Sequence, residues 1–166
     1  MNRVVSLEKM EIAQTKNIDD FKHCALLMSE SEPWITLKRT YEASLKMISD
    51  PLKEIYIARI NNKIIGFMIL QMVGAFRGYL QSICVAPEYR NMGIGTNMLR
   101  FVERRVFKES PNIFIIVSSF NKKAQKLYRK LKYKKIGILK DFIVPGYSEI
   151  LFRKTISALV DFISKD

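Results

Sequence analysis

Residues 64–73 constrain the fold of this chain most strongly, because they form a nearly unbroken apolar run without a charged side chain. The run is about half as long as the ~20 residues of a membrane-spanning helix, and its composition suits a strand that is buried on both faces. Another β-rich run, residues 54–60, precedes it, and the pair Asn61-Asn62 between the two runs tolerates a positive φ. We therefore predict a β-hairpin within a sheet.

The rest of the chain alternates segments of helical and of strand character. Strand character is found in residues 4–13, 54–60, 64–73, 78–85, 113–117, 133–139 and 149–153. Helical character is found in residues 17–28, 36–48, 94–107 and 121–131, with a short terminal helix at 155–163. Apolar residues at helical spacing, such as Met98 and Val102, support the helices. The order β-α-α-β-β-β-α-β-α-β-β predicts one α/β (α+β) domain over residues 1–166, with a mixed central sheet of about seven strands flanked by helices.

The formal net charge of +12 points to an anionic partner without naming it. A nucleic acid, an acidic protein and an anionic cofactor are all compatible with this charge. Basic residues are concentrated late in the chain, at Lys122, Lys123, Lys126, Arg129, Lys130, Lys132, Lys134 and Lys135. Aromatic side chains that stack on bases are sparse among them, so we expect no specific nucleic-acid partner and favour a basic surface around an anionic cofactor.

The cysteines and the histidine argue against several kinds of site. Cys24 and Cys84 lie far apart and have no histidine at ligand spacing, so we expect no disulfide and no metal site. His23 is the only histidine, which argues against a Ser/His/Asp hydrolase. No stretch reaches the length of a membrane span, and residues 1–7 lack the apolar run of a signal peptide. We therefore expect a cytoplasmic protein without a membrane partner.

The segment from Val85 to Thr96 follows a predicted strand and opens a predicted helix. A turn at such a junction exposes unpaired amide groups at the positive end of the helix. Gly93 and Gly95 let an anionic group approach this backbone without meeting a Cβ atom, which suits a pyrophosphate. The alternative is a connecting loop whose glycines serve only its turn. The spacing matches neither a Walker loop nor the dinucleotide fingerprint.

Two motifs give this segment a specific resemblance. The first is Arg90-x-x-Gly93-x-Gly95, and the second is Asn121-x-x-Ala124-x-x-Leu127-Tyr128-x-x-Leu131-x-Tyr133. Together with the order of elements, they resemble the Gcn5-related N-acetyltransferases over nearly the whole chain. The resemblance implies that family's fold, acetyl-CoA as the cofactor, and direct transfer of an acetyl group to a primary amine in a ternary complex.

The resemblance also implies roles for individual positions. The loop amides would hold the CoA pyrophosphate, and the preceding strand would bond the pantetheine arm like an added strand. The implied cofactor-binding residues are Ile83, Val85, Arg90, Asn91, Met92, Gly93, Ile94, Gly95, Thr96 and Asn121. Tyr128 matches the general acid that protonates the departing CoA sulfur. The alternative roles are helix capping for Asn121 and packing for Tyr128.

The motifs do not identify the general base. An amine with a pKa near 10.4 must lose a proton before it attacks a thioester. Many relatives carry an acid where this chain has Ile116 or Gln81, and neither side chain accepts a proton. Glu149, on a late predicted strand, is the candidate base. The alternatives are Glu30, Glu32, Tyr79 and a water chain to bulk solvent.

The acceptor pocket is expected between the loop of residues 30–34 and the late strands. Trp34 and Gln81 are the candidate substrate-binding residues, although Trp34 also suits a role in the core. We expect the acceptor to be an amine of a small molecule or of a protein, and a homodimer is compatible with the sequence. Two other functions remain open: a CoA-binding regulatory domain without turnover, and a basic nucleic-acid-binding protein.

Overall fold

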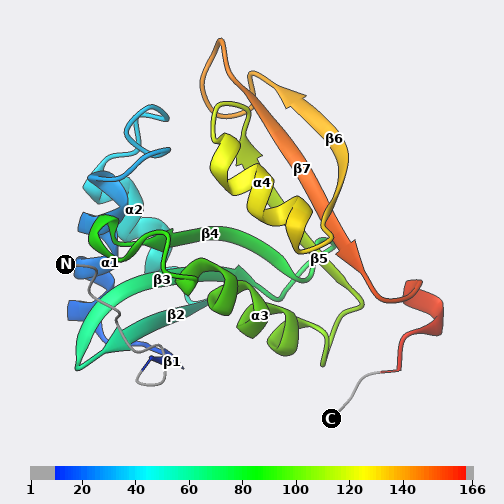
Figure 1. Ribbon diagram of the computed structural model, residues 1–166, viewed down its shortest axis with the longest axis horizontal. Helices are drawn as coiled ribbons and strands as arrows, with labels where there is room; N and C mark the ends of the chain where they lie inside the picture. Colours follow the sequence, from blue (N-terminus) through cyan, green and yellow to red (C-terminus); the bar gives the residue numbers. More distant parts are fainter. Residues whose placement is uncertain (1–9, 164–166) are drawn as a thin grey trace.

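The computed structural model describes residues 10–163, which form a seven-stranded sheet with four α-helices (Figure 1). The strands are β1 (Glu11–Gln14), β2 (Lys53–Ile60), β3 (Lys63–Gln71), β4 (Tyr79–Val85), β5 (Asn112–Ser118), β6 (Lys134–Lys140) and β7 (Ser148–Thr155). The helices are α1 (Ile18–Ser29), α2 (Tyr41–Ile48), α3 (Ile94–Val106) and α4 (Lys122–Lys130), with short 3-10 turns at Pro87–Tyr89 and Leu159–Asp161. The strand order is β1-β2-β3-β4-β5-β7-β6, in which β4 and β5 are parallel and the other described pairs antiparallel. The predicted mixed sheet and order of elements are confirmed.

The predicted hairpin is formed by β2 and β3. Asn61 and Asn62 make its turn with φ angles of 49° and 63°, a left-handed region that asparagine tolerates better than most residues. Residues 64–70 of β3 are all buried. This strand is therefore covered on both faces, as its apolar run predicts.

Three predicted elements differ from the structure by more than two residues at a boundary. α2 begins at Tyr41 rather than at residue 36, because Thr40 caps it by accepting a 3.2 Å hydrogen bond from the Ala43 amide, and residues 32–38 form turns instead. The predicted terminal helix at 155–163 is only a 3-10 turn, since β7 continues to Thr155 by pairing with β5. The first strand is Glu11–Gln14, and residues 4–9 of its predicted range lie outside the described residues.

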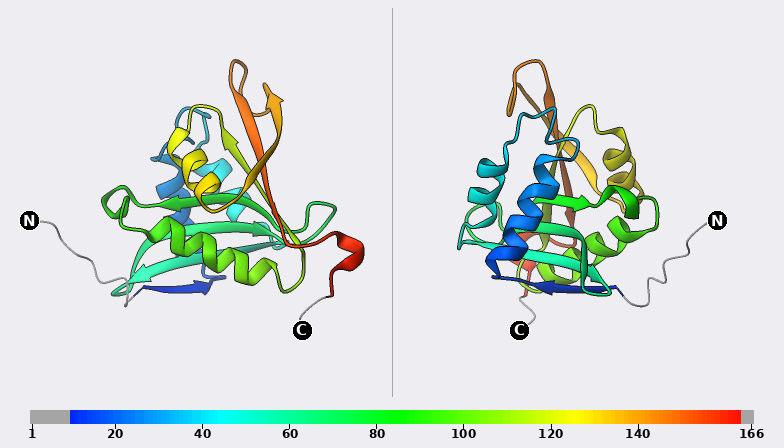
Figure 2. Two further views of the ribbon diagram at one scale, coloured as in Figure 1. Left: turned by 45° about the vertical axis from the view of Figure 1, so that its right-hand side comes forward. Right: turned by 90° about the vertical axis from the view of Figure 1, so that its left-hand side faces the viewer.

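Helices cover both faces of the sheet and enclose two apolar cores (Figure 2). α3 and α4 pack on one face, the α3/α4 face, where Met98 and Val102 meet Ile115 of β5. α1 and α2 pack on the other, the α1/α2 face, where Met28 meets Phe67 of β3. Burial of this apolar surface is the main term that stabilises the layers. Within residues 10–163, none of the helices combines the length and the hydropathy needed to cross a membrane.

The sheet opens between β4 and β5. The two strands pair only at their beginning, where Tyr79 and Leu80 lie opposite residues 114–115. On its other side, β4 shifts register against β3 at the same point, so that Gln81 is an extra, bulged residue. β4 and β5 therefore separate beyond Leu80.

Candidate active site

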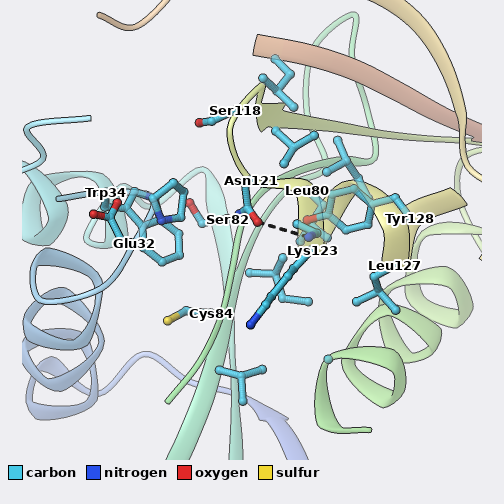
Figure 3. Close-up of a pocket in the computed structure, with 18 of the residues that line it drawn as sticks. Glu32, Trp34, Leu80, Ser82, Cys84, Ser118, Asn121, Lys123, Leu127 and Tyr128 are labelled. Atoms are coloured by element: carbon cyan, nitrogen blue, oxygen red, sulfur yellow. Dashed lines mark hydrogen bonds between the residues drawn. The ribbon is translucent and has the colours of Figure 1, made fainter. Parts of the chain in front are cut away.

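A cavity of about 700 Å³ occupies the opening between β4 and β5 (Figure 3). On the α3/α4 face it is lined by α4 and by the segment of residues 90–96, which we call the glycine loop. On the α1/α2 face it is lined by residues of the loop that precedes α2. Figure 3 shows Trp34 and Glu32 on one side of it, with Asn121 and Tyr128 on the other. The tip of the β6–β7 hairpin, Phe142 and Ile143, adds an apolar wall. The cavity thus connects the two faces of the sheet.

The glycine loop leads into α3, the one described α-helix without a side-chain cap. Asn17, Thr40 and Asn121 cap the other three, whereas the N-cap of α3 is Gly93 with a φ of 80°. The first amides of an α-helix have no partner within the helix and lie at the positive end of its dipole. Since Gly93 and the first residues of α3 line the cavity, their amides are available to an anion there.

Nine of the ten predicted cofactor-binding residues line this cavity. The exception is Met92, whose side chain packs against the core of the α3/α4 face. Arg90 folds back onto β4, where its Nε donates a 2.9 Å hydrogen bond to the Val85 carbonyl. A Cβ atom at Gly95 would meet Leu127 at 3.6 Å, which is ordinary contact, so the fold itself has room for a methyl group at this position.

α4 presents Asn121 and Tyr128 to the cavity. The Asn121 Oδ1 accepts a 3.2 Å hydrogen bond from the Ala124 amide, and its side-chain nitrogen has no protein partner within the described residues. Tyr128 is buried, and its ring packs edge to face against Phe152 with centroids 5.9 Å apart. Burial raises the pKa of the Tyr128 hydroxyl, so the group is protonated at neutral pH and able to donate.

Glu149 is 2% exposed and has one oxygen free. The Ser118 hydroxyl donates a 3.1 Å hydrogen bond to its Oε2, while its Oε1 is buried without a partner among residues 10–163. Both residues line the cavity. Burial raises the pKa of the Glu149 carboxyl, and the hydrogen bond from Ser118 opposes this shift. A carboxylate with a raised pKa is a stronger base, so Glu149 is suited to accept a proton from an amine.

The alternative bases are placed less well. Glu30 is exposed at the end of α1 and does not line the cavity. Glu32 lines it, but Thr36 binds both of its oxygens, through the amide at 3.2 Å and the hydroxyl at 3.1 Å. Burial and the nearby Glu149 raise the pKa of Tyr79 to about 12, which keeps this phenol protonated. Ile116 also lines the cavity and contributes apolar surface only.

Comparison with known proteins identifies the family. The profile of the Acetyltransferase (GNAT) family matches residues 18–133. The chain belongs to this family. An N-alpha-acetyltransferase of Sulfurisphaera tokodaii is 26% identical to it over 105 residues, which are 55% of this chain and 62% of the relative, so the chain spans less than two thirds of that protein.

Solved structures of GNAT acetyltransferases share the fold. The ribosomal-protein-S18-alanine N-acetyltransferase from Escherichia coli superposes with a TM-score of 0.73 at 17% identity, covering 93% of this chain and 98% of that one. A GNAT acetyltransferase from Elizabethkingia anophelis, solved with acetyl-CoA bound, superposes with a TM-score of 0.67 at 21% identity, covering 90% and 99%.

Acetyl-CoA is the cosubstrate of GNAT acetyltransferases, and the residues of this cavity fit it. The uncapped amides at the start of α3 suit its pyrophosphate. The edge of β4 beyond Leu80, which β5 leaves unpaired, suits the amides of its pantetheine arm.

Trp34 lies on the α1/α2 face of the cavity. It is buried and stacks on Phe67 with centroids 6.4 Å apart, and it also lines the cavity. Gln81, the bulged residue, lines the cavity, and its buried Oε1 has no partner in the part of the chain that the structure describes. Both predicted substrate-binding residues therefore reach the same space.

Several residues that line the cavity were not predicted from the sequence. They are Arg39, Ser118, Lys123, Phe142 and Ile143. Ser118 carried a signal, because it is a polar residue at the end of an apolar strand. The others come from loops and from an exposed helix face, and only the tertiary structure brings them together. In Figure 3, Lys123 extends from α4 across the cavity toward β4.

One cysteine lines the cavity, whereas Cys24 and the histidine do not. Cys84 lines the cavity, but burial raises its pKa to about 12, so the thiol is neutral at physiological pH. His23 is exposed on α1 and does not line the cavity. Across residues 10–163, no group of three or more histidine, cysteine, aspartate or glutamate side chains is arranged to hold a metal ion.

Proposed function

We propose that this protein is an N-acetyltransferase that moves an acetyl group from acetyl-CoA directly to a primary amine. One observation carries the proposal: a single cavity joins the uncapped N-terminus of α3 to the free oxygen of buried Glu149, through the gap between β4 and β5. An anionic cosubstrate on one face and an amine on the other would meet in this gap. Direct transfer in a ternary complex then needs no covalent intermediate on the chain, and the neutral Cys84 thiol agrees with this.

Acetyl-CoA supplies a thioester, whose carbonyl carbon the amine attacks and whose thiolate departs. The protein must hold the two reactants and move two protons. We assign the pyrophosphate to the amides of residues 90–96. The side-chain nitrogen of Asn121, which has no protein partner among the described residues, is assigned to the pantetheine arm.

The two protons move on opposite faces of the sheet. We assign Glu149 as the base, because its Oε1 is free and burial raises its pKa. We assign Tyr128 as the acid, because its hydroxyl is protonated at neutral pH and lies on the helix that lines the cosubstrate side. Tyr79 stays protonated beside Glu149, which makes it a hydrogen-bond donor rather than a base.

The proposed acceptor is a primary amine, and the α-amino group of a polypeptide is the favoured kind. Gln81 Oε1 and Glu149 Oε1 are both buried, partner-free acceptors that belong to residues lining the cavity. An amine that enters the cavity has N–H groups to donate to such atoms, whose burial without a partner is otherwise costly. The N-alpha-acetyltransferase relative, although only 26% identical, favours a polypeptide amine over a small molecule.

The remaining expectations stay predictions. They are a single domain over residues 1–166, a cytoplasmic location and no specific nucleic-acid partner. Of the eight basic residues that are concentrated late in the chain, Lys123 alone lines the cavity. The other seven are therefore assigned to the basic surface around it.

The test is thiol release from acetyl-CoA across a panel of amines, with CoA binding followed by thermal shift. The panel pairs peptides that have a free α-amine with N-blocked peptides that offer only a lysine, and adds polyamines. Binding with release from the free α-amine supports the proposal. Binding without release from any amine would favour a regulatory CoA-binding domain, and absence of both would overturn the assignment.

A further inference from the structure

Arg39 is a half-buried cation without a counterion in the described part of the chain. Three arginines are half-buried there, namely Arg39, Arg59 and Arg105. Arg59 forms an ion pair with Asp20, and Arg105 with Glu54 and Glu109. Arg39 forms no ion pair and its side chain makes no hydrogen bond within residues 10–163. A half-buried guanidinium is stabilised by a nearby anion, and its planar donors suit a carboxylate.

The backbone holds Arg39 at the wall of the cavity. Its amide donates a 2.9 Å hydrogen bond to the Trp34 carbonyl, which anchors the end of the loop just before α2. Its side chain lines the cavity together with Leu37 and Met47 of the α1/α2 face. The carboxylate nearest in sequence that lines the same space, Glu32, is already bound to Thr36. Within the described residues no carboxylate lies at ion-pair distance from Arg39, so its guanidinium is available to an anion that enters the cavity.

Arg39 and Glu149 bring opposite charges to the same cavity. Both charges act on the Tyr79 hydroxyl: Glu149 raises its pKa, and Arg39 lowers it. A simple cationic amine would be attracted by Glu149 and repelled by Arg39. An acceptor that carries an amine and a carboxylate would place each group beside its counterion.

We propose that the acceptor of this enzyme carries a carboxylate close to its amine, and that Arg39 binds this carboxylate while Glu149 faces the amine. This inference rests on the acetyl transfer proposed above and adds the substrate class. Two kinds of molecule carry a carboxylate close to an amine: a polypeptide with an acidic side chain at its first or second residue, and a free amino acid. Arg39 is thus the residue that determines acceptor specificity.

The experiment measures kcat/KM by thiol release with matched acceptors. Peptide amides that begin Ser-Glu, Ser-Gln or Ser-Lys form one arm, and free glutamate against its α-amide forms the other. We expect the wild-type protein to prefer the acidic acceptor over its neutral isostere by about 10-fold or more, the range of a charge-assisted hydrogen bond. Arg39→Met should bring this ratio close to one, and Arg39→Glu should invert it in favour of Ser-Lys. A preference for Ser-Glu among the peptide amides identifies a polypeptide acceptor. A preference for free glutamate over its α-amide identifies a free amino acid.

Two controls separate the outcomes. Lys46→Met removes a cation from the exposed side of α2, outside the cavity lining, and should leave the ratio unchanged. Binding of the same acceptors to the CoA-bound protein is followed by calorimetry. Turnover without preference for acidic acceptors would overturn the role of Arg39 while acetyl transfer stands. A binding preference that depends on Arg39, without turnover, would support that role and contradict acetyl transfer.

Discussion

Ser118 and Glu149 face each other across β5 and β7, and the Ser118 hydroxyl donates a 3.1 Å hydrogen bond to Oε2 of the glutamate. The antiparallel register makes them direct partners, so the sheet itself positions the carboxylate. Gln125 steadies this end of β5, because its Nε2 donates to the carbonyls of Ser118 and Ser119 at 3.1 and 3.0 Å. The free Oε1 of Glu149 is thus held by regular secondary structure rather than by a loop.

The first prediction concerns Glu149 as the base. Its pKa is raised, so the acid limb of the kcat/KM profile should lie above the ordinary glutamate value of about 4.3. Glu149→Gln should lower turnover by about 10²–10⁴-fold and remove this limb. Ser118→Ala removes the hydrogen bond that opposes the shift, so it should move the limb to higher pH. Wild-type rates and an unchanged limb in Glu149→Gln would exclude this residue as the base.

The same shift has a defined sign for stability. The folded state favours the neutral form of Glu149, so its pKa there exceeds that of the unfolded chain. The unfolding free energy should therefore fall as the pH rises from the unfolded value through the folded one. A glutamine cannot ionise, so the Glu149→Gln variant does not lose this part of the unfolding free energy as the pH rises. The difference in unfolding free energy between the variant and the wild type should therefore favour the variant more at pH 8 than at pH 4. Urea unfolding at the two pH values measures the difference.

Gly95 tests the anion site at the start of α3. A Cβ atom there makes only ordinary contact with Leu127 and Val85, at 3.6 and 3.9 Å, so the fold should accept Gly95→Val. The larger side chain should enter the cavity and weaken acetyl-CoA binding by about 10- to 100-fold, the value of one charge-assisted hydrogen bond. Gly137→Val is the matched control, because Gly137 lies on β6 outside the cavity lining. Equal affinity in the two variants would remove the glycine loop from the site.

Tyr128→Phe removes the proposed acid and keeps the ring that packs on Phe152. Turnover should fall by about 10²–10⁴-fold at saturating amine, with little change in acetyl-CoA affinity. The CoA thiol is a fairly good leaving group, so the loss should be smaller wherever amine attack limits the rate. Rates are therefore compared at several pH values. A variant that matches wild type throughout would make Tyr128 a packing residue.

Gly66 tests how closely β3 and β4 must approach. A Cβ atom there would lie 2.6 Å from the Cys84 carbonyl oxygen and 3.2 Å from the Met98 sulfur. Gly66→Ala should therefore destabilise the protein by about 1–3 kcal/mol, the usual cost of overpacking. Gly137→Ala, whose Cβ would meet Leu151 at an ordinary 4.0 Å, is the comparison. Urea unfolding of the two variants checks this, and equal stability would show that β4 shifts freely.

Local chemistry explains the parts of the fold that could be predicted from the sequence. The apolar run of β3, the turn at Asn61-Asn62 and the cap at Asn17 each determine the structure of their own segment. The boundaries that differed depended on competition between segments. The apolar pattern of residues 36–48 predicted a helix from residue 36, but the capping hydrogen bond of Thr40 starts α2 later.

The sequence by itself determined the order of the elements and the glycine loop, since both depend on residues adjacent in the chain. It also carried the two motifs that indicate the family. Only the tertiary structure decided which residues face one another across the cavity. Arg39, Ser118 and Glu149 come from a loop and two strands that are far apart in sequence. Their proximity depends on strand register and on the gap between β4 and β5, which result from packing of the whole sheet rather than from local preference.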